Sequence, residues 1–171
     1  MKKALLVTWL VIIPAILIAN DFVMLFMERC AETNRPLNNV NIGKAMLERM
    51  AENTNDEELK EAFSKLNSIR IISSDSRRDS RYYFRKADEL IKEAFAGYRE
   101  VVSVNEQETR LSVWIKEIGE KEQDIILLSL DEEDKFTVIT VTGEIDFRSI
   151  ARLSGSLKNE PELMKQTDQE Q

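Results

Sequence analysis

Residues 110–142 read RLSVWIKEIGEKEQDIILLSLDEEDKFTVITVT and contain three apolar runs of strand length separated by two short polar breaks. In the first run, 111–115, apolar and polar side chains alternate, which is typical of a strand with one buried face. The second run, 124–130, is apolar on both faces and predicts a central strand. The third run, 136–142, also carries apolar side chains on both sides. Short polar breaks join antiparallel neighbours, so this stretch predicts an antiparallel meander.

The residues before this stretch extend the pattern. Residues 100–104 predict a further strand, and 68–73 predict an earlier one, in which Ile69 and Ile71 alternate with Arg70. Between them, 77–95 has apolar residues at helical spacing and predicts the longest helix, facing the sheet. Shorter helices are expected at 22–31, 44–51 and 56–66, with a short strand at 40–42. The predicted fold is an α+β two-layer sandwich, a mainly antiparallel meander sheet of about five strands with helices packed on one face.

The two ends of the chain differ from this domain. Lys2 and Lys3 precede an apolar run at 4–19, the pattern of an export signal. The run is shorter than the roughly 20 residues that cross a bilayer comfortably. Ala19 suits the last position before cleavage but Leu17 is a poor third-from-last residue, so an uncleaved anchor is the alternative. We expect a signal peptide or uncleaved anchor at 1–20, a single α+β domain at 21–156 and a disordered tail at 157–171.

A last short helix is expected after the third apolar run. Asp146 is a suitable helix cap, and Phe147, Ile150 and Ala151 follow at helical spacing. Gly155 is expected to end this helix.

Composition excludes several classes of function. The chain has no histidine and one cysteine, which excludes Ser-His-Asp and Cys-His catalysis, histidine-ligated metals, thiolate metal sites and an internal disulfide. The five glycines are scattered singly, so no loop is suited to cradle a phosphate. A formal net charge of −7 is unfavourable for nucleic-acid binding. We therefore expect no catalytic residues, no metal and no cofactor.

The predicted long helix has a basic face at its amino-terminal half. Arg77, Arg81 and Arg85 follow one another at helical spacing, with Arg78 and Lys86 beside them. Arginine forks suit phosphate, so this face is a candidate for binding lipopolysaccharide, anionic lipid or an acidic partner. The alternative is a solvated face whose charge is offset by nearby acids.

Trp114 is the second binding candidate. Its side chain points to the face opposite Leu111, Val113 and Ile115. If that face is open, Trp114 belongs to an apolar patch of the kind that marks partner surfaces. The alternative is that the amino-terminal helix covers it.

Two groups of acids are candidates for a metal site or for catalysis. Asp131–Asp134 places four carboxylates in a tight turn, but lacks the alternating spacing of a calcium loop and is better explained as a solvated hairpin tip. Glu144 and Asp146 lie two residues apart and are the candidate acid pair of a carboxylate-based hydrolase, although Asp146 is better explained as a helix cap.

Three segments also resemble one bacterial family. Residues 40–47 (VNIGKAML), 66–74 (LNSIRIISS) and 128–146 (LSLDEEDKFTVITVTGEID) are similar to motifs of the family called domain of unknown function 4252. Gly43 departs from the serine that is more usual there. The resemblance implies a small exported protein of bacteria with an outer membrane, no known reaction, no assigned catalytic residues and a link to envelope signalling.

Together these observations predict an exported protein of the periplasm or outer cell envelope that works as a non-enzymatic binding or interaction module. Its expected partner is an unknown envelope protein or an anionic lipid or glycan, with no nucleic acid and with membrane contact only through an uncleaved leader. The alternatives are a carboxylate-based hydrolase and a membrane-anchored sensor module of envelope signalling.

Overall fold

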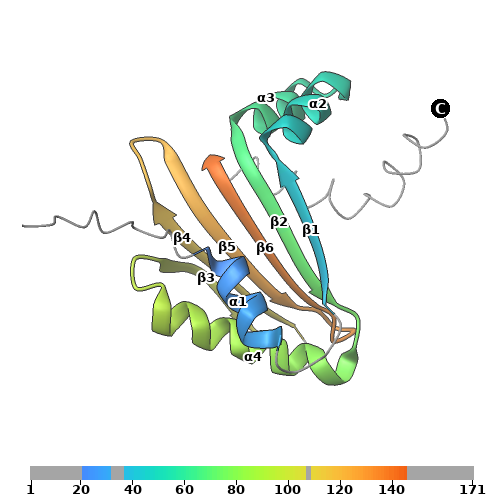
Figure 1. Ribbon diagram of the computed structural model, residues 1–171, viewed down its shortest axis with the longest axis vertical. Helices are drawn as coiled ribbons and strands as arrows, with labels where there is room; N and C mark the ends of the chain where they lie inside the picture. Colours follow the sequence, from blue (N-terminus) through green and yellow to red (C-terminus); the bar gives the residue numbers. More distant parts are fainter. Residues whose placement is uncertain (1–20, 32–36, 107–108, 146–171) are drawn as a thin grey trace, which may run out of the picture.

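The computed structural model describes residues 21–31, 37–106 and 109–145 (Figure 1). These residues form four helices and one six-stranded antiparallel sheet. The helices are α1 (Phe22–Ala31), α2 (Lys44–Asn53), α3 (Glu57–Lys65) and α4 (Arg77–Ala94). The strands are β1 (Asn38–Gly43), β2 (Leu66–Ser74), β3 (Arg99–Asn105), β4 (Arg110–Glu117), β5 (Glu122–Leu130) and β6 (Phe136–Glu144).

The strand order is β1-β2-β6-β5-β4-β3. Strands β3 to β6 are therefore the predicted meander, and β4, β5 and β6 pair without a register shift, with Trp114 opposite Ile126 and Ile126 opposite Thr140. Strand β2 precedes α4 in the sequence and pairs with β6. The sheet has one strand more than the five expected, because β1 adds to the outer edge of β2.

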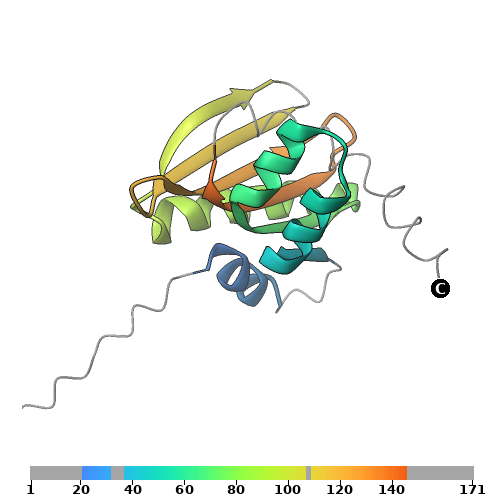
Figure 2. The ribbon, with the colours of Figure 1, turned by 90° about the horizontal axis from the view of Figure 1, so that it is seen from above.

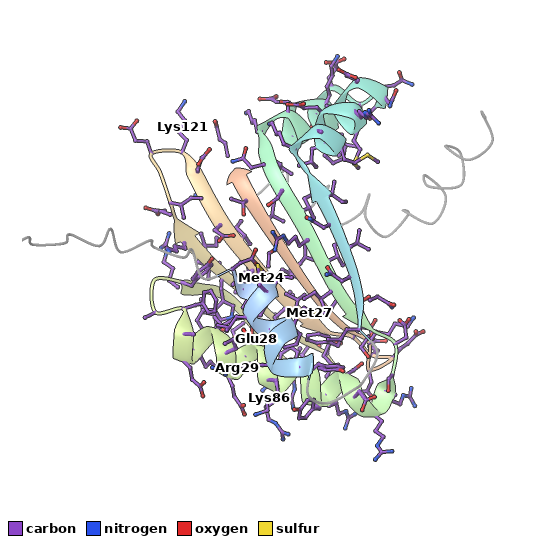
Figure 3. The ribbon with its side chains drawn as sticks, in the orientation of Figure 1. Met24, Met27, Glu28, Arg29, Lys86 and Lys121 are labelled. Carbon is purple, nitrogen blue, oxygen red and sulfur yellow. The ribbon has the colours of Figure 1, made fainter. Side chains whose placement is uncertain are left out.

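Helices α1 and α4 lie on one side of the sheet, called here the first face (Figure 2). Their buried side chains meet the strands in a cluster rich in aromatic rings. Phe26 of α1 lies within ring contact of Tyr83 and Phe136, with centroids 6.2 and 5.8 Å away. On the outward side of α1, Met24 and Arg29 are exposed (Figure 3). The predicted packing of the long helix on the sheet is confirmed.

The opposite side of the sheet, the second face, is aliphatic. Helices α2 and α3 lie at one end of β1 and β2 (Figure 1). There, Leu47 and Ala51 of α2 and Phe63 of α3 pack with Ile42 and Ile69 of the strands. Helices thus contact both faces rather than one. The reason is that β2, β5 and β6 carry apolar side chains on both sides, and each side has to be removed from water.

Two local features position the start of β2. Asp56 caps α3, because its Oδ1 accepts hydrogen bonds from the backbone N–H groups of Glu58 and Leu59 at 2.9 and 3.1 Å. Gly143 of β6 has a φ of 148°, and a Cβ atom there would lie 2.6 Å from the carbonyl oxygen of Lys65. Only glycine allows β6 to approach the α3–β2 junction this closely.

The predicted leader at 1–20, the predicted last helix with its Asp146 cap and the predicted tail at 157–171 lie outside the described residues. Among the helices that are described, none has the length and apolar character needed to span a membrane.

Candidate functional site

The four arginines predicted as a binding face lie exposed on one side of α4, and we call Arg77, Arg78, Arg81 and Arg85 the arginine face. Two of them converge on Asp134 in the turn between β5 and β6. Arg81 donates from Nε to Oδ1 of Asp134 at 2.7 Å and from Nη2 to Oδ2 at 3.2 Å. Arg77 Nε lies 3.6 Å from the same Oδ2. The basic helix and the acidic turn, which the sequence presented as separate features, therefore form one site.

The local fold explains why these two segments meet. Ser80 is buried in the first turns of α4, where its hydroxyl donates to the Ser74 carbonyl at 3.0 Å and accepts from the Phe136 N–H at 3.3 Å. This ties the start of α4 to the start of β6 and places the turn beside Arg81. Within the turn, Asp134 has a φ of 56°, a left-handed conformation that aspartate tolerates.

The electrostatics of this site favour charged side chains. The hydrogen bond from Arg81, together with the charge of Arg77, lowers the pKa of Asp134 below its usual value. The same contact raises the pKa of Arg81. The Asp134 side chain is 14% exposed, whereas those of Arg77 and Arg81 are 75% and 72% exposed. The carboxylate is thus sheltered, and the two guanidinium groups it holds remain open to a partner.

The other two members of the arginine face are less constrained. Arg85 Nε lies 4.0 Å from Glu89 Oε1, at the limit of an ion pair. For Arg78, the described part of the chain shows no ion pair. The Asp134 carboxylate therefore pairs with two of the four exposed guanidinium groups of the arginine face. The neighbouring acid Glu133 is paired with Lys135 at 2.6 Å.

Trp114 lies on the first face, as its position in the strand predicts, but it is only 9% exposed. It packs in the cluster formed by α1, α4 and the sheet. The covered alternative is thus what the structure shows, and Trp114 is not part of an exposed patch. Its indole Nε1 is buried and has no hydrogen-bond partner in the described structure.

A polar cluster that sequence reasoning missed lies on the first face near the start of α1. Asp124 of β5 accepts a hydrogen bond from the Tyr98 hydroxyl on Oδ2 and one from the Thr142 hydroxyl on Oδ1, the latter at 3.2 Å. Burial raises the pKa of Asp124 and that of Tyr98. Because both carboxylate oxygens already accept hydroxyl hydrogens, the arrangement joins three elements of the fold and leaves no free catalytic carboxylate at this position.

Beside it, Arg70 of β2 pairs with Asp21, whose other oxygen caps α1 by accepting from the backbone N–H of Val23 at 2.9 Å. Lys116 Nζ lies 5.8 Å from the ring centroid of Tyr98. No spacing in the sequence connects Asp21, Arg70 and Asp124, because long-range pairing of strands brings them together.

The remaining candidates are not assembled into a site in the described residues. Glu144 is exposed at the end of β6, and its proposed partner Asp146 lies outside the described residues. In the described part of the chain, no three acidic or cysteine side chains converge as metal ligands would. Cys30 is buried against the first face, and burial raises the pKa of its thiol to about 11.

Comparison with known families agrees with the motifs. The model of the family described as Domain of unknown function (DUF4252) matches residues 32–153. The chain belongs to this family. The match to DUF4252 covers all six strands and helices α2 to α4, and it begins just after α1. No curated protein and no solved structure matches the chain.

Proposed function

We propose that this DUF4252 protein is an exported, non-enzymatic binding module that engages an anionic partner of the cell envelope through the arginine face. The observation that carries the proposal is that Asp134, itself sheltered, holds Arg77 and Arg81 while their guanidinium groups stay about three-quarters exposed. Pre-oriented guanidinium forks bind phosphate or carboxylate with less loss of side-chain entropy than free ones do. Arg78 and Arg85 extend the same surface.

Export is supported by the basic and apolar leader at 1–20. It is also compatible with the chemistry of the only cysteine. Cys30 is buried and its thiol pKa is raised to about 11, so little reactive thiolate forms in an oxidising compartment. A non-enzymatic role is supported by the lack of histidine and by the engagement of both Asp124 oxygens.

The test uses charge reversal that leaves the Asp134 contacts in place. The variant is Arg78→Glu/Arg85→Glu, and the matched control is Arg49→Glu/Arg99→Glu, which makes the same change in net charge at two other exposed arginines. Binding of wild type and both variants is measured by co-sedimentation with vesicles of anionic phospholipid, vesicles of zwitterionic phospholipid, and lipopolysaccharide aggregates. Pull-downs from envelope extract test an acidic protein as the partner.

Wild type and control are expected to bind one anionic probe equally, and the arginine-face variant about tenfold or more weakly, with all binding weakened by salt. Equal binding by the three proteins would refute the arginine face as the contact surface. Capture of the same background proteins by all three, with no anionic probe bound, would remove the proposal altogether.

The two alternatives are separated by different measurements. A membrane-anchored sensor module would retain its leader, and the intact mass of the protein isolated from cells would include residues 1–20. A carboxylate-based hydrolase requires two acids roughly 5–10 Å apart across a substrate site. Turnover of a glycan or peptide that is lost in a Glu144→Gln variant would favour it over the binding module.

A further inference from the structure

The two edge strands of the sheet differ in the side chains they expose. Strand β1, at one edge, exposes three asparagines, and its two apolar side chains are buried or partly buried. Strand β3, at the other edge, exposes Val101 and Val102, each 37% exposed. In the described residues β3 pairs with β4 alone, so its outer side is open (Figure 1). A valine-rich edge strand with an open side is a surface on which another strand can pair.

The backbone of β3 also directs hydrogen-bonding groups to its open side. Glu106 donates from its backbone N–H to the Thr109 carbonyl at 2.9 Å, which joins the end of β3 to the start of β4. In an antiparallel pair, residues whose N–H and C=O groups face the partner strand alternate with residues whose groups face away. Counted back from Glu106, Val104 and Val102 therefore bond to β4. The backbone groups of Ser103, between them, face the open edge.

The sequence of this strand is nearly symmetric about Ser103. Residues 100–106 read EVVSVNE, so valine stands on both sides of Ser103 and glutamate stands three places away in both directions. If two copies pair antiparallel across a two-fold axis at Ser103, Val102 of each copy lies opposite Val104 of the other. Both valines lie on the second face, because they pair with β4 residues of that face. Self-pairing therefore brings four valines together on one side of the joined sheet.

The charges of β3 are arranged for the same pairing. The register shift in β3 places Arg99 on the second face, opposite Ile115, and turns Glu100 to the first face. Glu106 lies on the second face by strand alternation. Antiparallel pairing therefore brings Arg99 of one copy toward Glu106 of the other, while Glu100 stays on the opposite face from Glu106. Arg99 is available for this contact, since it is held only by an exposed ion pair with Glu117 at 3.5 Å.

We propose that β3 is a self-association edge, at which residues 101–105 of two copies pair antiparallel across a two-fold axis at Ser103 and join two sheets into one. A second copy is the occupant that fits, because the valines and the charge order of β3 complement themselves. Only five residues a side form the contact, so the dimer is weak. It does not depend on the proposed function, because the arginine face lies in the amino-terminal half of α4 and β3 follows the other end of that helix (Figure 1).

The direct test is a disulfide across the proposed axis, made in the protein in the form isolated from cells. Opposite Cα atoms of a hydrogen-bonded antiparallel pair lie about 5.5 Å apart, a distance that a disulfide can span. Ser103→Cys is expected to form a covalent dimer on mild oxidation. The matched control Asn41→Cys, exposed on edge strand β1, is expected to stay monomeric. Cys30 does not interfere, because it is buried and its thiol pKa is raised to about 11. Equal cross-linking of both variants, or none in either, would overturn the proposal.

Sedimentation equilibrium measures the association itself, at a salt concentration of about 0.15 M that screens repulsion between the two acidic copies. Wild type is expected to show a monomer–dimer equilibrium. Val102→Lys should raise the dimer dissociation constant about tenfold or more, because it places a charge against the valines of the other copy. Asn41→Lys makes the same change in charge on β1 and should leave the constant unchanged.

A wild-type protein that is monomeric at every concentration would contradict the proposal. A dimer that Val102→Lys does not weaken would place the contact on another surface and would contradict it as well. If Val102→Lys fails to fold, the cross-linking of Ser103→Cys still decides.

Discussion

The two faces of the sheet are built in different ways. The first face is covered by α1 and α4, which bring the rings of Phe22, Phe26 and Tyr83 against the strands. The second face is aliphatic and is covered by described helices only at the end of β1 and β2. Helix α1 lies outside the DUF4252 match, yet its side chains are part of the first-face core. The packed domain therefore extends beyond the residues that the family model matches.

The largest expected effect tests whether α1 belongs to the core. Phe26 is fully buried, so Phe26→Ala should lower the free energy of unfolding by about 3–5 kcal/mol through lost contacts and a new cavity. Met24 lies on the same helix and is 68% exposed, so Met24→Ala should change it by less than about 0.5 kcal/mol. Urea unfolding midpoints measure both. Equal effects would mean that α1 does not pack as described.

A smaller difference in the free energy of unfolding is expected between substitutions at two neighbouring residues that point to opposite faces. Ile126 points to the first face and is fully buried, whereas Leu127 points to the second face and is only partly buried. Ile126→Ala is expected to cost about 2–5 kcal/mol and Leu127→Ala about 1–2 kcal/mol, because less apolar surface is re-exposed at the second site. Denaturant unfolding of the two variants decides. A larger loss for Leu127→Ala would reverse the comparison.

The smallest effects concern two aspartates with opposite pKa shifts. Asp124 has a pKa raised by burial, so its stabilising contribution is present below the unfolded-state pKa of about 4 and is lost as the pH rises through the raised value. Asp134 has a pKa lowered by Arg81, so its contribution is present above about pH 4 and is lost as the pH falls through the lowered value.

The measurement is urea unfolding of wild type, Asp124→Asn and Asp134→Asn over a series of pH values. The stability of wild type relative to Asp124→Asn should decrease as the pH rises above about 4, and relative to Asp134→Asn it should decrease as the pH falls below about 4. Added salt should weaken the Asp134 effect more, because the guanidinium groups of Arg77 and Arg81 that pair with this carboxylate are exposed to solvent. If both differences in the free energy of unfolding changed in the same direction with pH, the environment of Asp124 or of Asp134 would be wrongly assigned.

Strand and helix periodicity was sufficient for most of the fold. The alternation in Leu111, Val113 and Ile115 predicted β4 and its two faces, and the spacing in 77–95 predicted α4 within one residue of its observed end. Strand β1 was predicted only as a short piece at 40–42, because Asn38 and Asn39 are poor strand formers that pair with β2 through their backbone. Its full extent depends on a partner strand distant in the sequence.

The candidate site was predicted only in part. Helical spacing placed the four arginines on one side of α4, because that spacing is a local property of the chain. The contact of Arg77 and Arg81 with Asp134, about fifty positions away, could not be read from spacing, nor could the meeting of Asp21, Arg70 and Asp124. For Trp114, the pattern predicted the correct face but left open whether a helix covered it.

Local pattern therefore decided the secondary structure, the meander and the family, because each depends on residues within a few positions of one another or on motifs read in order. The burial of Trp114 in the cluster formed by α1, α4 and the sheet, the shelter of Asp134 beside two arginines and the uneven burial of the second face were decided by tertiary structure. Burial and ion pairing depend on which surfaces meet in space, and that follows from the pairing of strands far apart in the chain.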